Sequence, residues 1–156
     1  MDKKKIADVL KEIDPFNTLD EQIRLETSGR AEIIHVPAGT YIFKQGDPSL
    51  EALFIIVSGL VEILVSSNKG AETFFGFRKP GDFFSETGVL STQPYAASTR
   101  AREDLVCIKI LRADLEALIY NYPEFSSYFN ELLAARMRTL YEQIQMLLVQ
   151  YFPECH

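Results

Sequence analysis

The sequence predicts a mainly β fold with helices at both ends, and two observations lead to this prediction. Between residues 31 and 111, short runs of strand-forming residues are separated by turn signals about every eight to twelve residues, a pattern typical of a sandwich or barrel. On either side of this region, apolar residues recur at helical spacing. The length of 156 residues suits one domain. We expect N-terminal helices in 1–30, a β-region in 31–111 and C-terminal helices in 112–150.

Two short helices are expected before the β-region. Apolar residues between Ile6 and Ile13 fall on one helical face, and Pro15 ends this first segment. Thr18 followed by Glu21 has the spacing of a capping box, which predicts the start of a second helix. Gly29 is expected to close it.

The β-region reads as a series of short strands separated by turns that contain glycine, proline, asparagine or aspartate. The expected strands are 33–36, 41–43, 53–57, 60–65, 72–77 and 105–110, with a further strand of small residues after Pro94. We expect Phe83 and Phe84, in the turn region before that strand, to lie in the core.

The C-terminal part is expected to be helical from Arg112, with a break at Pro123 and a long helix from Phe125 to Val149. In the long helix, apolar residues recur at intervals of four and three. They are Leu133, Met137, Leu140, Ile144, Leu147 and Tyr151. This short heptad pattern predicts a homodimer formed through the last helix. Arg136 and Arg138 are expected on a solvated face of the same helix.

Composition and charge disfavour two functional classes. The net charge of −6 argues against a nucleic-acid-binding surface, because phosphate contacts need clustered lysine and arginine. No apolar run has the length of a membrane span, and the N-terminus lacks the apolar core of a signal peptide. We therefore expect a cytoplasmic protein without direct membrane or nucleic-acid contacts.

The few cysteine and histidine residues argue against a metal enzyme. Cys107 lies in an apolar strand pattern and reads as a buried hydrophobe, whereas Cys155 is next to the C-terminus, so no disulfide is expected. A metal-dependent barrel enzyme would need several converging ligands, but the only histidines are His35 and His156. We expect no metal, no cofactor and no enzymatic activity.

Five motifs occur in an order and at intervals that resemble a known family. They are VPAGT at 36–40, QGD at 45–47, FIIVSGLV at 54–61, GDFFSE at 81–86 and PYAAS at 94–98. Together they resemble the cyclic-nucleotide-binding domain family, over roughly residues 16–138. The resemblance implies an eight-stranded β-roll (a double-stranded β-helix, jelly-roll-like) flanked by helices.

The same resemblance implies a ligand site for cAMP or cGMP around residues 84–97. It assigns Glu86 to the ribose 2′-hydroxyl and Thr87 to a short helix whose backbone N–H groups meet the phosphate. Ser85 stands at a close-approach position that is glycine in the family. The implied ligand-binding residues are Phe84, Ser85, Glu86, Thr87, Tyr95, Ala96 and Ala97.

Tyr95 departs from the family pattern, because the family places its phosphate-binding arginine there. A lost charge-assisted hydrogen bond of about 1.5–3 kcal/mol predicts binding weaker by about 10- to 150-fold. Tyr95 is expected to be a packed aromatic that fills the space, and Glu86 to be left as an unbalanced negative charge. Arg100 and Arg102 have the opposite strand parity and are not expected to replace the missing cation.

Two regulatory interpretations remain open. The chain is either a cyclic-nucleotide-binding-like sensor in signal transduction or a degenerate interaction and dimerisation module. In the same way, Glu86 either binds a ribose or only satisfies backbone N–H groups at a helix start. Because the chain ends at His156 without room for a helix-turn-helix, we expect it to act through a partner or to be a piece of a longer signalling protein.

Overall fold

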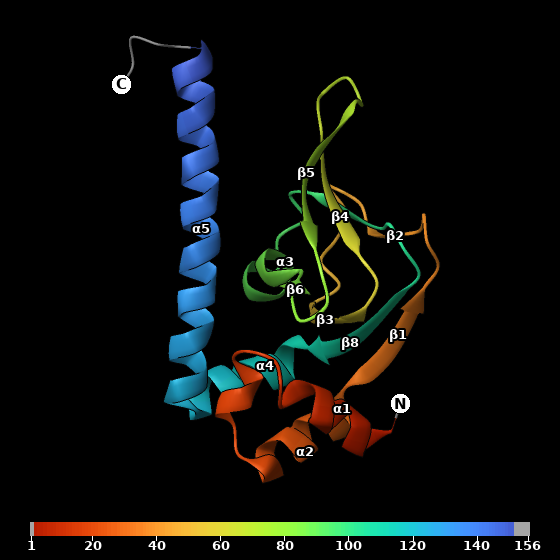
Figure 1. Ribbon diagram of the computed structural model, residues 1–156, viewed down its shortest axis with the longest axis vertical. Helices are drawn as coiled ribbons and strands as arrows, with labels where there is room; N and C mark the ends of the chain where they lie inside the picture. The colour runs from red at the N-terminus through yellow and green to blue at the C-terminus, as the bar shows by residue number, and fades with distance from the viewer. Residues whose placement is uncertain (1, 152–156) are drawn as a thin grey trace.

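The computed structural model describes residues 2–151 and contains eight strands in two four-stranded antiparallel sheets (Figure 1). The strands are β1 (Glu32–Val36), β2 (Tyr41–Phe43), β3 (Ala52–Ser58), β4 (Val61–Ser66), β5 (Glu72–Arg78), β6 (Phe83–Phe84), β7 (Ser98–Ala101) and β8 (Leu105–Leu111). One sheet has the order β1-β8-β3-β6, and the other has the order β2-β7-β4-β5. The predicted eight-stranded β-roll is confirmed.

Strand β3 shows why the sequence folds into two layers. Its Leu53 and Ile55 face a cluster shared with the helices, whereas Phe54 and Ile56 face a cluster between the sheets. A strand buried on both faces carries a continuous apolar run instead of an alternating one. Strand β8 pairs with β3, placing Ile108 opposite Ile55, and closes the same layer.

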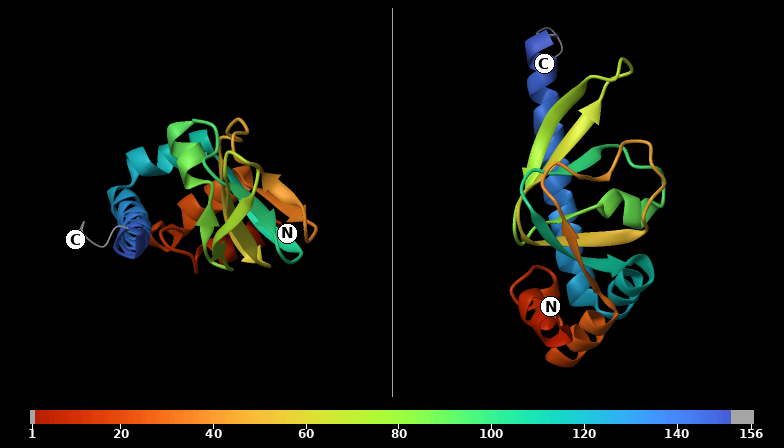
Figure 2. Two further views of the ribbon diagram at one scale, coloured as in Figure 1. Left: turned by 90° about the horizontal axis from the view of Figure 1, so that it is seen from above. Right: turned by 90° about the vertical axis from the view of Figure 1, so that its right-hand side faces the viewer.

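Helices precede and follow the roll along the chain, and the short helix α3 (Glu86–Ser91) lies between β6 and β7. The others are α1 (Lys3–Leu10), the 3₁₀ turn η1 (Phe16–Thr18), α2 (Glu21–Arg30), α4 (Arg112–Asn121) and α5 (Pro123–Tyr151). Figure 2 shows α1 and α2 gathered below the roll and α5 running along its side.

The predicted capping box at the start of α2 is wrong. The N-cap is Asp20, whose Oδ1 accepts the backbone N–H of Ile23 at 2.9 Å. Thr18 instead lies in η1 and donates its hydroxyl to the carbonyl of Pro15 at 2.7 Å. Gly29 lies inside α2, which continues to Arg30. An aspartate directly before the first helical residue satisfies one of the free N–H groups and needs no glutamate partner to cap the helix.

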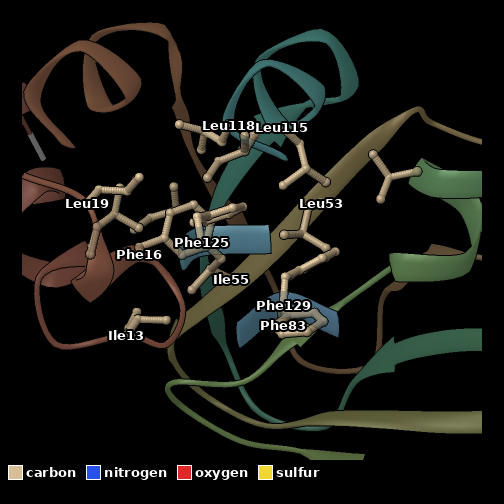
Figure 3. Packing of buried hydrophobic residues seen from close by; sticks show 14 of the residues in the cluster. Ile13, Phe16, Leu19, Leu53, Ile55, Phe83, Leu115, Leu118, Phe125 and Phe129 are labelled. Carbon is tan, nitrogen blue, oxygen red and sulfur yellow. The ribbon is translucent and has the colours of Figure 1, made fainter. Parts of the chain in front are cut away.

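The helices attach to the roll through a cluster of buried aromatic and aliphatic side chains (Figure 3). Phe125 of α5 packs edge-on against Phe16, with the ring centroids 5.2 Å apart, and Phe129 stacks on Phe83 at 5.3 Å. Because Phe16 belongs to the N-terminal helical segment and Phe83 to β6, these contacts fix the beginning of α5 against both. Truncating a phenylalanine buried in this way costs about 3–5 kcal/mol.

The second half of α5 leaves this cluster. Leu133 packs partly against the cluster, but the later members of the predicted heptad pattern are exposed. These are Met137, Leu140, Ile144, Leu147 and Tyr151. Figure 1 shows this part of the helix extending beside β5 and past the roll.

The structure also bears on the remaining composition arguments. Cys107 is buried as predicted, and burial raises the pKa of its thiol to about 12. Cys155 and His156 lie outside the described residues. Within residues 2–151, no three His, Cys, Asp or Glu side chains are grouped as metal ligands. None of the described helices has the length and apolar character that a bilayer crossing requires.

Candidate functional site

A pocket of about 520 Å³ opens between the sheet that contains β4 and β5, the short helix α3 and the middle of α5. All seven residues assigned to the site from the sequence line this pocket. They are Phe84, Ser85, Glu86, Thr87, Tyr95, Ala96 and Ala97. The volume falls within the usual range of about 300–1,000 Å³ for small-molecule sites. The fold therefore brings the candidate residues together, while their role in binding remains a prediction.

The turn into α3 is sharp, and Ser85 makes it. Its φ of 74° lies in the left-handed region, where glycine is the usual residue. A side chain there costs about 1–2 kcal/mol. The hydroxyl of Ser85 lies 3.0 Å from the hydroxyl of Tyr95, a buried hydrogen bond that offsets part of this strain.

Tyr95 is a packed aromatic, as predicted. It is 3% exposed and stacks on Phe43 with the ring centroids 3.5 Å apart. Its hydroxyl accepts the backbone N–H of Leu50 at 3.0 Å. A Cβ on Gly88 would clash with the tyrosine ring, so the glycine makes room for it. At this wall of the pocket an aromatic ring occupies the position where the family has a cation.

Two arginines also line the pocket. Nη1 of Arg136, on α5, lies 2.8 Å from Oε1 of Glu86, and Nη2 of Arg78, on β5, lies 3.9 Å from the same oxygen. Nη2 of Arg136 also donates to the carbonyl of Phe83 at 2.6 Å, and its guanidinium lies 4.1 Å from the centre of the Phe83 ring.

Two predictions about these charges are wrong. Arg136 is not on a solvated face, because the packing of Phe129 against the roll turns the next part of α5 toward the pocket. Its side chain is only 24% exposed. Glu86 is not unbalanced, because two guanidinium groups face it. Among the described residues, its carboxylate contacts these arginines and not the backbone N–H groups of α3.

Arg78 is held in an unfavourable environment. Burial lowers the pKa of its guanidinium, the nearby charge of Arg136 lowers it further, and Glu86 opposes both effects. Since arginine stays charged in proteins, Arg78 is a partly buried cation at the pocket.

Three buried side-chain polar atoms of the described residues have no hydrogen-bond partner. They are Nε of Arg78, Nη1 of Arg136 and Oγ1 of Thr99. Nη1 of Arg136 is close to Glu86 as an ion pair, but the carboxylate oxygen lies off the direction of its N–H bonds. All three residues line the pocket. Buried polar groups are normally paired, so the unpaired ones mark the surroundings of the pocket as incompletely satisfied.

Arg100 and Arg102 do not face the pocket. Both donate hydrogen bonds of 2.7 Å to the carboxylate of Glu62. Strand β7 begins at Ser98, later than expected, but its alternation is as predicted, because Ala97 and Thr99 line the pocket whereas Arg100 does not. Neither arginine therefore supplies the positive charge that is missing at the Tyr95 position.

Comparison with known proteins gives the family. The model of the cyclic nucleotide-binding domain matches residues 33–122. The chain is 32% identical to the cAMP-dependent protein kinase regulatory subunit of Emericella nidulans over 110 residues, which is 70% of this chain and 26% of that protein. It is also 32% identical to the cyclic AMP receptor protein of Thermus thermophilus over 111 residues, 71% of this chain and 51% of that one.

The structural similarity agrees with the sequence similarity. The crystal structure of Thermus thermophilus catabolite activator protein superposes with a TM-score of 0.74 at 29% identity, covering 89% of this chain and 62% of that one. The chain thus spans about a quarter and a half of the two curated relatives. With the β-roll, the cassette and the pocket described above, the chain belongs to the cyclic nucleotide-binding domain family and is a regulatory, ligand-sensing domain of that family.

Proposed function

We propose that this domain is part of a longer cytoplasmic signalling protein, detects a small molecule in the pocket and passes its presence on through α5. In this proposal the domain is a sensor and not an enzyme. The observation that supports it is the contact of 2.8 Å between Glu86 of the cassette and Arg136 of α5. A ligand that touches either side chain changes this contact and therefore the position or rigidity of the long helix.

The proposal includes weak or absent binding of cAMP and cGMP. The aromatic ring of Tyr95 fills the position of the missing cation, and its hydroxyl is already engaged by Leu50 and Ser85. A nucleotide in the family orientation would find no arginine at the cassette. Replacing Tyr95 by arginine should add a charge-assisted contact, and a glycine at Ser85 should relieve the left-handed strain.

Calorimetric titration with cAMP and cGMP tests this part of the proposal. The proteins are the wild type, Ser85→Gly, Tyr95→Arg and the double variant. We expect no binding or weak binding by the wild type, a gain in Tyr95→Arg that falls with added salt, and the largest gain in the double variant. Micromolar or tighter binding by the wild type would contradict the inference from Tyr95.

We also propose a homodimer formed through the exposed half of α5. The apolar positions from Met137 to Tyr151 recur at heptad spacing and are exposed in the single chain, which favours pairing with a second copy. Sedimentation at micromolar concentrations tests it, with Ile144→Glu as the disrupting variant and Gln145→Glu as the matched control. A wild-type protein that stays monomeric on concentration contradicts the proposal.

The alternative function is a module that dimerises but binds no ligand. The exposed apolar positions of α5 support it as well as they support the sensor. It predicts a dimer, no small molecule retained in a native mass measurement, and no binding by any of the four variants above. The sensor predicts that a ligand can be found.

A further inference from the structure

The pocket contains an incomplete charge arrangement that the family's ligand chemistry does not explain. Among residues 2–151, the charged residues that line it are Arg78, Arg136 and Glu86, so two guanidinium groups face one carboxylate and leave a formal charge of +1. Both guanidinium groups contact the same oxygen, Oε1, and neither donates it a hydrogen bond. The cations come from β5 and α5 and contact Glu86 at the start of α3.

Much of the remaining lining of the pocket is apolar, beside a few hydroxyl and amide side chains. The apolar part includes Phe43, Ile63, Val65, Phe75, Phe84 and Leu140. Such walls with a few converging polar groups are typical of sites for organic molecules, where the apolar part supplies contact area and the polar groups fix the orientation. Thr99 adds one unpaired hydroxyl to this wall.

We infer that the pocket binds an organic oxyanion, a carboxylate or phosphate on an apolar body, with its acidic group between Arg78 and Arg136. This rests on the proposed function, in which the pocket takes a ligand. The acidic oxygens would pair with the guanidinium groups of Arg78 and Arg136, which line the pocket and face a single carboxylate. The body would lie on the apolar side chains, with the acid between β5 and α5, beside Glu86, and not at the Tyr95 position.

Two negative groups act against such a ligand. Glu86 faces the same arginines, and Asp82 is close enough to Arg78 to raise the pKa of its guanidinium. Asp82 is turned toward the surface, where its Oδ2 accepts the backbone N–H of Lys79 at 2.9 Å. A monoanion neutralises the remaining charge of the pocket, whereas a dianion would overcompensate it. The site therefore selects ligands with a single negative charge.

Matched pairs of acid and neutral compounds test the inference by calorimetry on the whole chain. The carboxylate arm uses decanoate against decanamide and 4-phenylbutyrate against 4-phenylbutanamide, and the phosphate arm uses cAMP against adenosine. We expect at least one acid to bind at least about 10-fold more tightly than its neutral partner, because it gains charge-assisted hydrogen bonds. The arm in which the preference appears identifies the acidic group.

Variants locate the acidic group. Arg78→Gln and Arg136→Gln should each weaken the preferred acid by about 10- to 150-fold and leave the neutral partner unchanged. The matched controls are Lys79→Gln, next to Arg78 in the chain, and Arg138→Gln, on the same helix as Arg136. Both side chains are exposed, so these variants should bind the acid and its neutral partner as the wild type does. Circular dichroism melting checks that each variant is folded. Arg78→Lys, which keeps the charge but loses the planar donors, is the second variant and should weaken the acid less than Arg78→Gln.

Three results would overturn the inference: acids and neutral partners that bind equally, an acid preference that survives both glutamine variants, or no binding in either arm. Equal binding leaves the ligand sensor intact and removes only the oxyanion. Tight binding of cAMP that depends on neither arginine would return the ligand to the cassette. No binding in either arm, together with no small molecule retained in a native mass measurement, removes both proposals.

Discussion

Two clusters of one glutamate and two arginines lie on opposite faces of the sheet that contains β4, β5 and β7. In the outer cluster, Glu62 accepts hydrogen bonds from Arg100 at 3.0 and 2.7 Å and from Arg102 at 2.7 Å. Hydrogen bonds from Arg100 and then Arg102 lower the pKa of the Glu62 carboxyl group, and the same bonds raise the pKa of Arg100.

The inner cluster has the same composition and the opposite character. Glu86 receives no hydrogen bond from Arg78 or Arg136, and the pKa of Arg78 is lowered. The outer cluster has hydrogen-bond geometry between partners on neighbouring strands. The inner cluster joins β5, α3 and α5, three elements that pack for other reasons. Equal charges therefore serve a different purpose in each, because, of the two clusters, only the inner one has buried donors without a hydrogen-bond partner.

The first prediction breaks the outer cluster. Glu62→Gln should lower the free energy of unfolding by about 2 kcal/mol, because hydrogen bonds to a charged group contribute about 1.5–3 kcal/mol. The arginines that cover Glu62 lie near the surface and keep part of their hydration, which limits the loss. Urea denaturation measures it, with the exposed Glu103→Gln as control. If the two variants are equally stable, the hydrogen bonds of the outer cluster contribute nothing.

The second prediction concerns pH. Because the pKa of Glu62 is lower in the folded chain than in the unfolded chain, its stabilisation is complete above the unfolded pKa and is lost as the pH falls through the folded pKa. The difference in stability between the wild type and Glu62→Gln should thus shrink below about pH 4.5. Urea denaturation at a series of pH values measures this difference. A difference that stays constant down to pH 3 would contradict the assigned cause.

The sequence allowed much of the fold to be predicted because the relevant signals are local. Turn residues at regular intervals mark the strands, and the continuous apolar run of β3 marks a strand between two layers. The burial of Tyr95 could also be predicted, because an aromatic residue in place of an arginine, among small neighbours, has few other roles. These signals depend on residues close together in the chain.

The inner cluster could not be predicted in the same way, because its members come from three elements. Two local signals were nevertheless present. Arg136 continues the series Phe125, Phe129 and Leu132 at intervals of four, three and four, so it lies on the buried face of α5. Arg78 has the same strand parity as Gly76, and both line the pocket. Neither signal identifies Glu86 as the partner, which requires the packing of α5 against the roll.

The third prediction sharpens the comparison at the inner cluster. Glu86→Gln removes the negative charge that competes with an oxyanion ligand, so an acid that binds the wild type should bind this variant on the order of tenfold more tightly, equal to about 1.4 kcal/mol. Titration with the acid that the wild type prefers measures the change, and its size should fall with added salt. Glu62→Gln is the matched control and should leave the binding of that acid unchanged. Weaker binding by Glu86→Gln would instead mean that the carboxylate itself contacts the ligand.

The smallest effect is expected for Arg102→Gln in the outer cluster. Arg102 is 57% exposed, and its guanidinium lies 5.7 Å from the centre of the half-exposed Phe77 ring. Ion pairs to exposed side chains contribute about 0–1 kcal/mol, so Arg102→Gln should lower the free energy of unfolding by less than about 1 kcal/mol. Arg100→Gln should lower it more, because Arg100 donates two hydrogen bonds to Glu62. Urea denaturation of both single variants and the double variant gives the coupling between them. A loss of stability in Arg102→Gln as large as that in Glu62→Gln would mean that the exposed ion pair between Arg102 and Glu62 supplies the stabilisation of the outer cluster. The difference between the two clusters would then result from solvent access and not from hydrogen-bond geometry.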